Sequence, residues 1–153
     1  MDMYLTLFLI STLWIGPFWI AMLLKPNNIY TLKLVEGPLF FIGPLLIWFF
    51  IFIVDFNNIS KFSLAFESSN TLIECFAMGL ANKTGFTATW AHVVVGDIFV
   101  TRWIWKRSLN LNLEVWPIRL SVFFGVMLMP LGLLLHLLFV KIKKNRLPKF
   151  YEV

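Results

Sequence analysis

The sequence predicts an all-α integral membrane protein, a four-helix bundle with a short interfacial helix between spans two and three. Hydrophobic residues make up 59% of the 153 residues and charged residues only 14%, and the mean hydropathy is +0.82. A soluble domain is closer to half apolar, so the surplus apolar surface requires lipid. Four apolar runs also approach the ~20 residues that cross a hydrocarbon core. The whole chain, residues 1–153, is therefore interpreted as one membrane domain.

The four predicted spans are followed by a basic tail. Their approximate bounds are 3–24, 38–54, 85–105 and 119–142, with the tail at 143–153. Basic residues divide almost equally between the two sides of this arrangement, so the positive-inside rule leaves the orientation open. The formal charge of +5 comes from short loops and the tail, which predicts headgroup contacts and no nucleic acid partner.

Prolines are expected to shape the first two spans. Gly16-Pro17 lies midway along the first span, where proline leaves a backbone carbonyl without its N–H partner and bends the helix. Pro38 suits the first turn of the second span, and Pro44 is expected to kink it. No small-residue cleavage site follows the first span, so it is interpreted as a retained helix and not a signal peptide.

A short amphipathic helix is predicted between spans two and three. Apolar and small residues recur there at helical spacing, at Leu72, Phe76, Gly79 and Leu80. Such a helix would lie in the membrane interface. Cys75 is the one cysteine of the chain, so an internal disulfide is excluded, and it is interpreted as a small apolar side chain.

Two histidines and one aspartate lie in the predicted spans where water should be scarce, and a charge at bilayer depth costs roughly 2.5–3.5 kcal/mol on insertion scales. His92 and Asp97 lie in the third span and His136 in the fourth. Such residues usually face a partner or a cavity, which makes them the principal functional candidates. Adjacent antiparallel helices would bring the two histidines to the same depth. Arg102, about one turn beyond Asp97, is the expected partner of that carboxylate.

Small and aromatic residues accompany these groups on their helix faces. Gly125, Met129 and Gly132 share one face of the fourth span with His136, and glycines there let another backbone or a flat ligand approach closely. Trp90 shares the face of Asp97, since successive residues turn by about 100°.

Structural interpretations of the same residues stay open. A buried histidine can bond a backbone carbonyl, Asp97 and Arg102 can form a structural pair, and the glycines can serve packing. A metal held by two histidines and Asp97 is less favoured, because Asp97 is predicted at a different depth. A haem held between the two histidines is geometrically possible and equally disfavoured. The sequence contains no HExxH, CxxC, P-loop or GxGxxG motif. Proton transfer is the chemistry that imidazole and a desolvated carboxyl perform well.

Two sequence motifs, one in the third predicted span and one in the fourth, resemble those of a known family. The third span contains W-x-H-x4-D-x-F-x2-R from Trp90 to Arg102, and the fourth contains P-x-G-x3-H from Pro130 to His136. With Pro17-Phe18-Trp19 in the first span, they resemble the abscisic-acid-deficient-four-like family, small four-span membrane proteins linked in plants to neoxanthin formation. The likeness covers about residues 14–140.

The resemblance implies a cofactor-independent carotenoid isomerase that converts an epoxy-carotenoid into an allenic one, in a thylakoid or other plastid membrane or a bacterial inner membrane. His92 and His136 would be the catalytic acid–base pair. The predicted substrate contacts are Trp90, Asp97, Arg102, Gly125, Met129 and Gly132, with no metal. The alternative is a non-catalytic pigment- or lipid-binding subunit of a photosynthetic or respiratory membrane complex. The expected partners are membrane lipid, carotenoid and, in the alternative, that larger complex.

Overall fold

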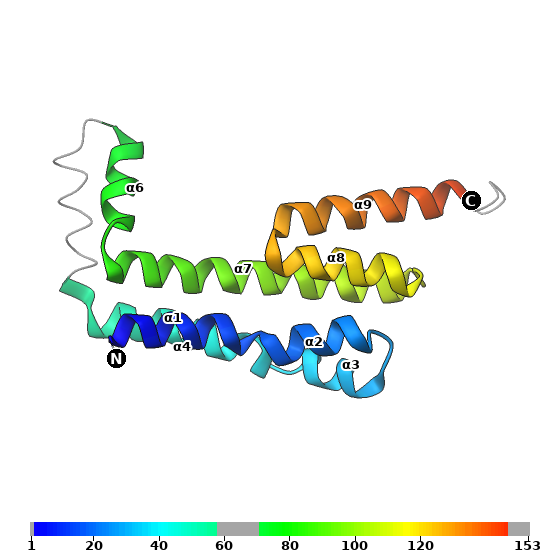
Figure 1. Ribbon diagram of the computed structural model, residues 1–153, viewed down its shortest axis with the longest axis horizontal. Helices are drawn as coiled ribbons and strands as arrows, with labels where there is room; N and C mark the ends of the chain where they lie inside the picture. The colour runs from blue at the N-terminus through cyan, green and yellow to red at the C-terminus, as the bar shows by residue number, and fades with distance from the viewer. Residues whose placement is uncertain (1, 58–70, 147–153) are drawn as a thin grey trace. The chain divides into compact units, whose positions relative to one another are not determined.

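The computed structural model describes residues 2–57 and 71–146, and its regular structure in those ranges is entirely α-helical (Figure 1). This confirms the predicted all-α class. The part of the predicted basic tail beyond residue 146 lies outside the described residues. The helices in chain order are α1 (Met3–Trp14), α2 (Gly16–Leu24), α3 (Ile29–Glu36), α4 (Leu39–Val54), α6 (Leu72–Leu80), α7 (Lys83–Asn110), α8 (Val115–Met127) and α9 (Met129–Arg146).

Three helices begin at polar capping residues that the sequence supplies. The side chains of Asp2, Asn28 and Thr71 accept hydrogen bonds from backbone N–H groups in the first turns of α1, α3 and α6. Such caps satisfy N–H groups that have no partner inside the helix. Helix α6 matches the predicted short helix between spans two and three.

Two helical stretches are long and apolar enough to cross a membrane by length and composition. They are Met3–Leu24, formed by α1 and α2, and Ile29–Val54, formed by α3 and α4. Only 22% and 28% of their most apolar segments are buried, whereas a core helix of a soluble protein would be mostly buried, so their exposed apolar surface fits lipid. The predicted third and fourth spans lie in α7, α8 and α9, which do not pass the same test, and the four-span bundle is not confirmed.

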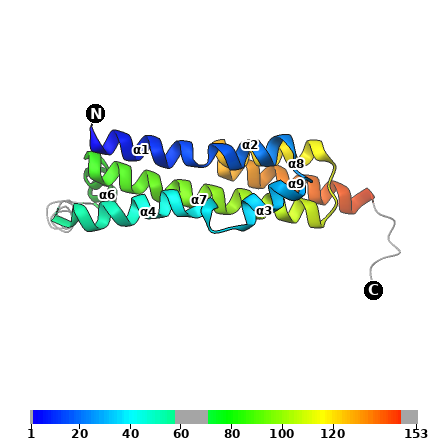
Figure 2. The same cartoon turned by 90° about the horizontal axis from the view of Figure 1, so that it is seen from below.

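The predicted fourth span differs from the structure in one respect. It is two helices, because α8 ends at Met127 and α9 begins at Met129. Between them, Leu128 has φ −150° and ψ 80°, outside the helical region. Pro130 is the second residue of α9, where its missing N–H removes no bond inside a helix. The chain reverses at this point, so that α8 and α9 lie side by side as a hairpin (Figures 1 and 2).

The chain divides into two compact units, and α7 contributes to both. The first unit comprises Met1–Ile15 and Phe41–Val95, and the second comprises Gly16–Phe40 and Gly96–Val153. In the first unit, Ile47, Ile51 and Ala91 form a buried apolar cluster between α4 and α7. In the second unit, α2 packs on α3 and α8, and α8 packs on α9. The candidate site residues are described below within the unit to which each belongs.

Candidate functional site

A histidine and a serine form a buried pair inside the second unit. The side chains of His136 on α9 and Ser108 on α7 are both 0% exposed. The Ser108 hydroxyl oxygen lies 3.1 Å from His136 Nδ1. The other ring nitrogen, Nε2, is buried and has no hydrogen-bond partner among the described residues. One nitrogen therefore orients the ring, and the other is a buried polar atom whose hydrogen-bonding capacity is unused among the described residues.

The position of Ser108 is fixed by the way α7 ends. Asn112 adopts a positive φ of 49°, a conformation that asparagine tolerates better than most residues. The chain then turns back so that Leu113 N–H donates to the Ser108 carbonyl at 3.0 Å, a Schellman-type termination. Lys143 Nζ on α9 donates to the Leu111 carbonyl at 2.6 Å. These bonds connect the end of α7 to α9, close to the serine–histidine pair.

An aromatic ring and a guanidinium stand next to His136. The Trp103 ring meets the His136 ring edge-on, with centroids 5.5 Å apart. The Arg107 guanidinium carbon lies 4.9 Å from the centre of the Trp103 ring, a cation–π contact. Trp103 and Arg107 also line a cleft of about 400 Å³ on α7, which we call the cationic cleft; its lining residues are Phe99, Arg102, Trp103, Lys106, Arg107 and Asn110.

A second hollow, the α8–α9 groove, lies about one turn along α9 from the buried histidine. It measures about 490 Å³ and is lined by Asn112, Leu113, Glu114, Pro117, Phe139, Ile142 and Lys143. Phe139 follows His136 by three residues, and such pairs are neighbours on one helix face. Glu114, at the N-cap position of α8, brings a carboxylate to the groove. The groove thus offers apolar walls with charged groups.

Two arginines of the second unit bond the carbonyls at helix ends. Arg119 donates to the carbonyls of Leu23 at 2.7 Å and Leu24 at 2.9 Å, at the end of α2. Arg102 donates to the Glu36 carbonyl at 3.0 Å, at the end of α3. Cations stabilise this end of a helix. The expected ion pair between Arg102 and Asp97 is not formed in the described part of the chain.

His92 differs from His136 in its surroundings. It is exposed, on the part of α7 that belongs to the first unit. Ser108 and His136 belong to the second unit. The predicted pairing of His92 with His136 stays a prediction.

The predicted substrate contacts on the fourth span take part in helix packing. A Cβ on Gly132 would lie 2.4 Å from the Gly125 Cα, and a Cβ on Gly125 would lie 2.7 Å from the Thr101 hydroxyl oxygen. The glycines thus let α7, α8 and α9 approach closely, and protein atoms fill this space. Met129, half-buried, is the first residue of α9. A role of these three residues in substrate binding stays a prediction.

The other predicted contacts, Trp90 and Asp97, lie in different units. Trp90 belongs to the first unit, where its indole N–H donates to the Thr12 hydroxyl at 2.9 Å and its ring contacts Phe8. Asp97 belongs to the second unit and is half-buried, and its backbone carbonyl accepts the Thr101 hydroxyl at 2.7 Å. These contacts account for the positions of the two residues, and their roles toward a substrate stay predictions.

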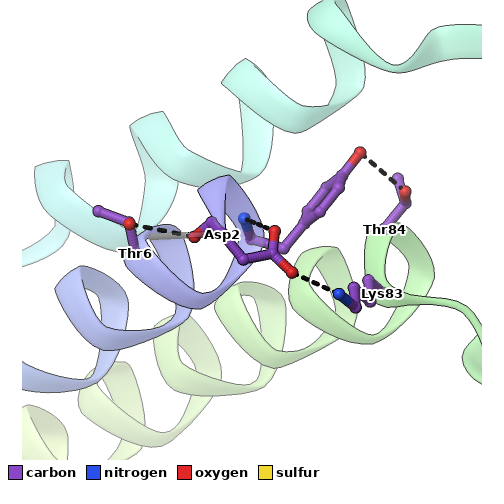
Figure 3. Close-up of polar contacts among 5 residues, drawn as sticks. Asp2, Thr6, Lys83 and Thr84 are labelled. Carbon is purple, nitrogen blue, oxygen red and sulfur yellow. Dashed lines mark hydrogen bonds and ion pairs between the residues drawn. The ribbon is translucent and has the colours of Figure 1, made fainter.

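A polar cluster fastens helix ends in the first unit. The Asp55 carboxylate after α4 accepts the hydroxyl of Tyr4 on α1 and that of Thr84 on α7, the latter at 2.6 Å. Beside it, the Lys83 ammonium reaches the Asp2 carboxylate (Figure 3). The hydrogen bond of this contact, and to a smaller extent the attraction of the two charges, lowers the pKa of Asp2 and raises the pKa of Lys83. The cluster joins the start of α1 to the end of α4 and the start of α7.

Sequence reasoning missed Ser108 and Glu114. A helical signal for the serine was present, because Thr101, Trp105 and Ser108 recur at positions i, i+4 and i+7 and are all buried. Glu114 had no such signal, since its place at the groove depends on the reversal of α9. Among the described residues, no three histidine, cysteine, aspartate or glutamate side chains gather as a metal site would require.

These features define an all-helical protein with two helices apolar and long enough to cross a membrane and a buried serine–histidine pair. The sequence matches the family described as ABA DEFICIENT 4-like over residues 6–136. The chain therefore belongs to this family, which confirms the resemblance found in its motifs. Comparisons with curated proteins and with solved structures gave no match. The family suggests involvement in carotenoid and neoxanthin-related metabolism, and a plastid membrane.

Proposed function

We propose that this protein isomerises an epoxy-carotenoid in a plastid or bacterial membrane, with His136 as its proton-transfer residue. The proposal rests on one observation in a chain of this family. His136 is buried, is held at Nδ1 by Ser108, and keeps an Nε2 without a partner among the described residues. Its place one turn from the α8–α9 groove adds support.

The reaction needs only proton movement. The epoxide oxygen takes up a proton as one of its C–O bonds breaks, and becomes a hydroxyl group. A proton leaves the adjacent polyene carbon, and the electron pair of that C–H bond forms the second double bond of the allene. Substrate and product have the same atoms, and no electrons are gained or lost. One group that gives a proton and one that takes a proton are sufficient.

The α8–α9 groove suits the end ring of such a substrate. Its volume of about 490 Å³ falls within the roughly 300–1,000 Å³ of typical ligand pockets. Leu113, Pro117 and Phe139 supply apolar walls, and Glu114 supplies a second proton carrier. In this arrangement His136 and Glu114 divide the acid and base roles.

The test is expression in a host that makes an epoxy-carotenoid, with pigments separated by chromatography. Wild type is expected to form a pigment of unchanged mass and altered spectrum. His136→Asn places an amide near the position of Nδ1 and removes Nε2, so that the bond to Ser108 can persist. We expect its product to fall about a hundredfold or more, in the range of general acid–base catalysis.

The matched control changes the other histidine. His92→Asn alters the same residue type on the exposed side of α7. Product lost with His136→Asn alone supports a single catalytic histidine, and product lost with both supports the predicted acid–base pair. Full activity of a folded His136→Asn variant would overturn the proposal.

The exposure of His92 favours a second candidate function, a pigment-binding subunit. An imidazole that faces lipid leaves its polar atoms unsatisfied, which is costly in an apolar surrounding. A bound pigment or a neighbouring protein would supply the missing partner. In this case pigment of unchanged mass and spectrum copurifies at a fixed ratio, and His92→Ala loses it whereas His136→Asn retains it.

A further inference from the structure

The last three turns of α7 combine positive charge with aromatic surface in one cleft. The cationic cleft of about 400 Å³ is lined by two arginines, a lysine, an asparagine and two aromatic rings. We propose that this cleft binds the phosphate headgroup of an anionic phospholipid, with an acyl chain along its aromatic end. The inference does not depend on the isomerase reaction, although the cleft includes Arg102, a predicted substrate contact, and Trp103, which contacts His136.

The charges of the cleft do not cancel. Lys106 Nζ lies 3.3 Å from Glu36 Oε1 at the end of α3, and Arg102 donates to the backbone carbonyl of the same residue. The Glu36 carboxylate therefore contacts Lys106, whereas Arg102 bonds a neutral carbonyl and Arg107 lies over the Trp103 ring. The net positive charge favours an anionic occupant, as basic groups beside membrane helices do.

Arg107 is oriented for a phosphate. Its guanidinium lies over the Trp103 ring, with the central carbon 4.9 Å from the ring centre. Such a contact uses the flat face of the guanidinium, and its N–H donors lie in the plane of the group, where they match two phosphate oxygens at once. Asn110, one helical turn further on, adds an amide donor to the same cleft.

The order of residues along α7 matches the order of groups in a lipid. Phe99, which is 61% exposed, comes first, Trp103 follows one turn later, and Lys106 and Arg107 come after it. From Phe99 to Asn110 the helix rises about 16 Å at ~1.5 Å per residue. An acyl chain along Phe99 thus continues into a headgroup at the cations. Tryptophan at this level is typical of a membrane interface.

The test is native mass spectrometry of the full chain in detergent, with phosphatidylglycerol or phosphatidylcholine added at equal concentration. We expect wild type to retain phosphatidylglycerol in preference to phosphatidylcholine. A cation near an anionic headgroup contributes about 1 kcal/mol, which is about fivefold in affinity. Lys106→Gln with Arg107→Gln should therefore reduce the preference by about twentyfold or more. Circular dichroism checks that the variant remains helical.

Two control variants and one competition measurement test the proposal further. Lys33→Gln removes an equal charge from an exposed position on α3 outside the cleft and should leave the preference unchanged. Glu36→Gln removes the carboxylate beside the cleft and should raise the preference for phosphatidylglycerol. This variant tests the cleft even if the double variant unfolds. Inorganic phosphate alone should not compete at millimolar concentration. The proposal would be overturned if Lys33→Gln reduced the preference for phosphatidylglycerol as much as the double variant does. It would also be overturned if Glu36→Gln failed to raise that preference, or if free phosphate competed fully.

Discussion

The two units use polar side chains in different ways. In the first unit, Asp55, Tyr4 and Thr84 bond one another at the ends of three helices, where they fasten segments that are distant in sequence. In the second unit, His136 and Ser108 are completely buried and leave one ring nitrogen without a partner among the described residues. A polar group that is satisfied at a helix end is explained by stability. A buried imidazole with only one of its two nitrogens hydrogen-bonded is not explained by stability, and a functional role is the natural explanation.

The two histidines sharpen this comparison. Both lie in runs that the sequence predicts to cross the membrane, yet His92 is exposed and His136 is 0% exposed. The histidine of the first unit is therefore exposed, whereas the histidine of the second unit is buried and hydrogen-bonded. Position in an apolar run does not distinguish the two cases, whereas the surroundings of each ring do.

The largest effect on stability is expected where α8 meets α9. In Gly132→Ala the new Cβ would lie 2.3 Å from the Gly125 backbone nitrogen, and backbone cannot move aside as a flexible side chain can. We expect the free energy of unfolding to fall by about 3 kcal/mol, the upper part of the usual range for overpacking. Denaturant titration in detergent, followed by circular dichroism, measures it.

Gly96→Ala is the matched control. It lies on the exposed side of α7, and its new Cβ would meet nothing within 4 Å. Alanine is favoured over glycine in helices by up to about 1 kcal/mol, so this variant should be as stable as wild type or more stable. Equal destabilisation by both substitutions would show that the hairpin contact does not hold the second unit together.

The helices of this fold could be predicted well from the sequence, and the α8–α9 hairpin could not. Gly16-Pro17 predicted the break between α1 and α2, and the spacing from Leu72 to Leu80 predicted α6. Pro130 lies in the fourth run, and a proline in an apolar run fits a bend as well as a reversal. The close contact of Gly125 with Gly132 distinguishes them, and it is a tertiary feature that helical periodicity does not contain.

Removal of the Ser108 hydroxyl should have the next largest effect. Ser108→Ala leaves Nδ1 of the buried His136 without its 3.1 Å partner. A buried group deprived of its partner costs about 1–3 kcal/mol, and we expect a loss of about 2 kcal/mol, together with lower isomerase activity. Thr12→Val, which removes the acceptor of the Trp90 indole in the first unit, is the comparison. It should cost about 1 kcal/mol and leave the activity unchanged.

The candidate site was only partly accessible to sequence reasoning. His136 could be identified because an ionisable residue in an apolar run is costly, but its partner Ser108 could not. The reason is that the serine sits at the end of α7 and reaches α9 only through the Asn112 turn and the reversal at Leu128. Asp97 and Arg102 were paired by their spacing, whereas the end of α3 supplies the carbonyl that Arg102 bonds.

A smaller effect is expected for the polar cluster of the first unit. Thr84→Val keeps the shape of the side chain and removes the hydroxyl that bonds Asp55 at 2.6 Å. A hydrogen bond to a charged group is worth about 1.5 kcal/mol at the lower end of its range, and we expect that loss in unfolding free energy. Isomerase activity and lipid preference should not change. A loss of activity at unchanged helicity would give the first unit a direct part in the reaction.

The smallest effect is expected for the exposed ion pair of Lys83 with Asp2. Folding lowers the pKa of Asp2, so the contribution of its carboxylate is present above the unfolded pKa of about 3.9 and is lost as pH falls through the folded value. Folding raises the pKa of Lys83, so its contribution is present below about 10.4 and is lost as pH rises through the folded value. Thermal unfolding of wild type and Asp2→Asn should therefore differ slightly at neutral pH, and the difference should shrink as pH falls below about 3.9 and as it rises above about 10.4. Surface ion pairs are screened by salt, so the difference should also shrink at high ionic strength. A difference of the same size at every pH would contradict a contribution from the charge of Asp2, since asparagine caps a helix as well as aspartate does.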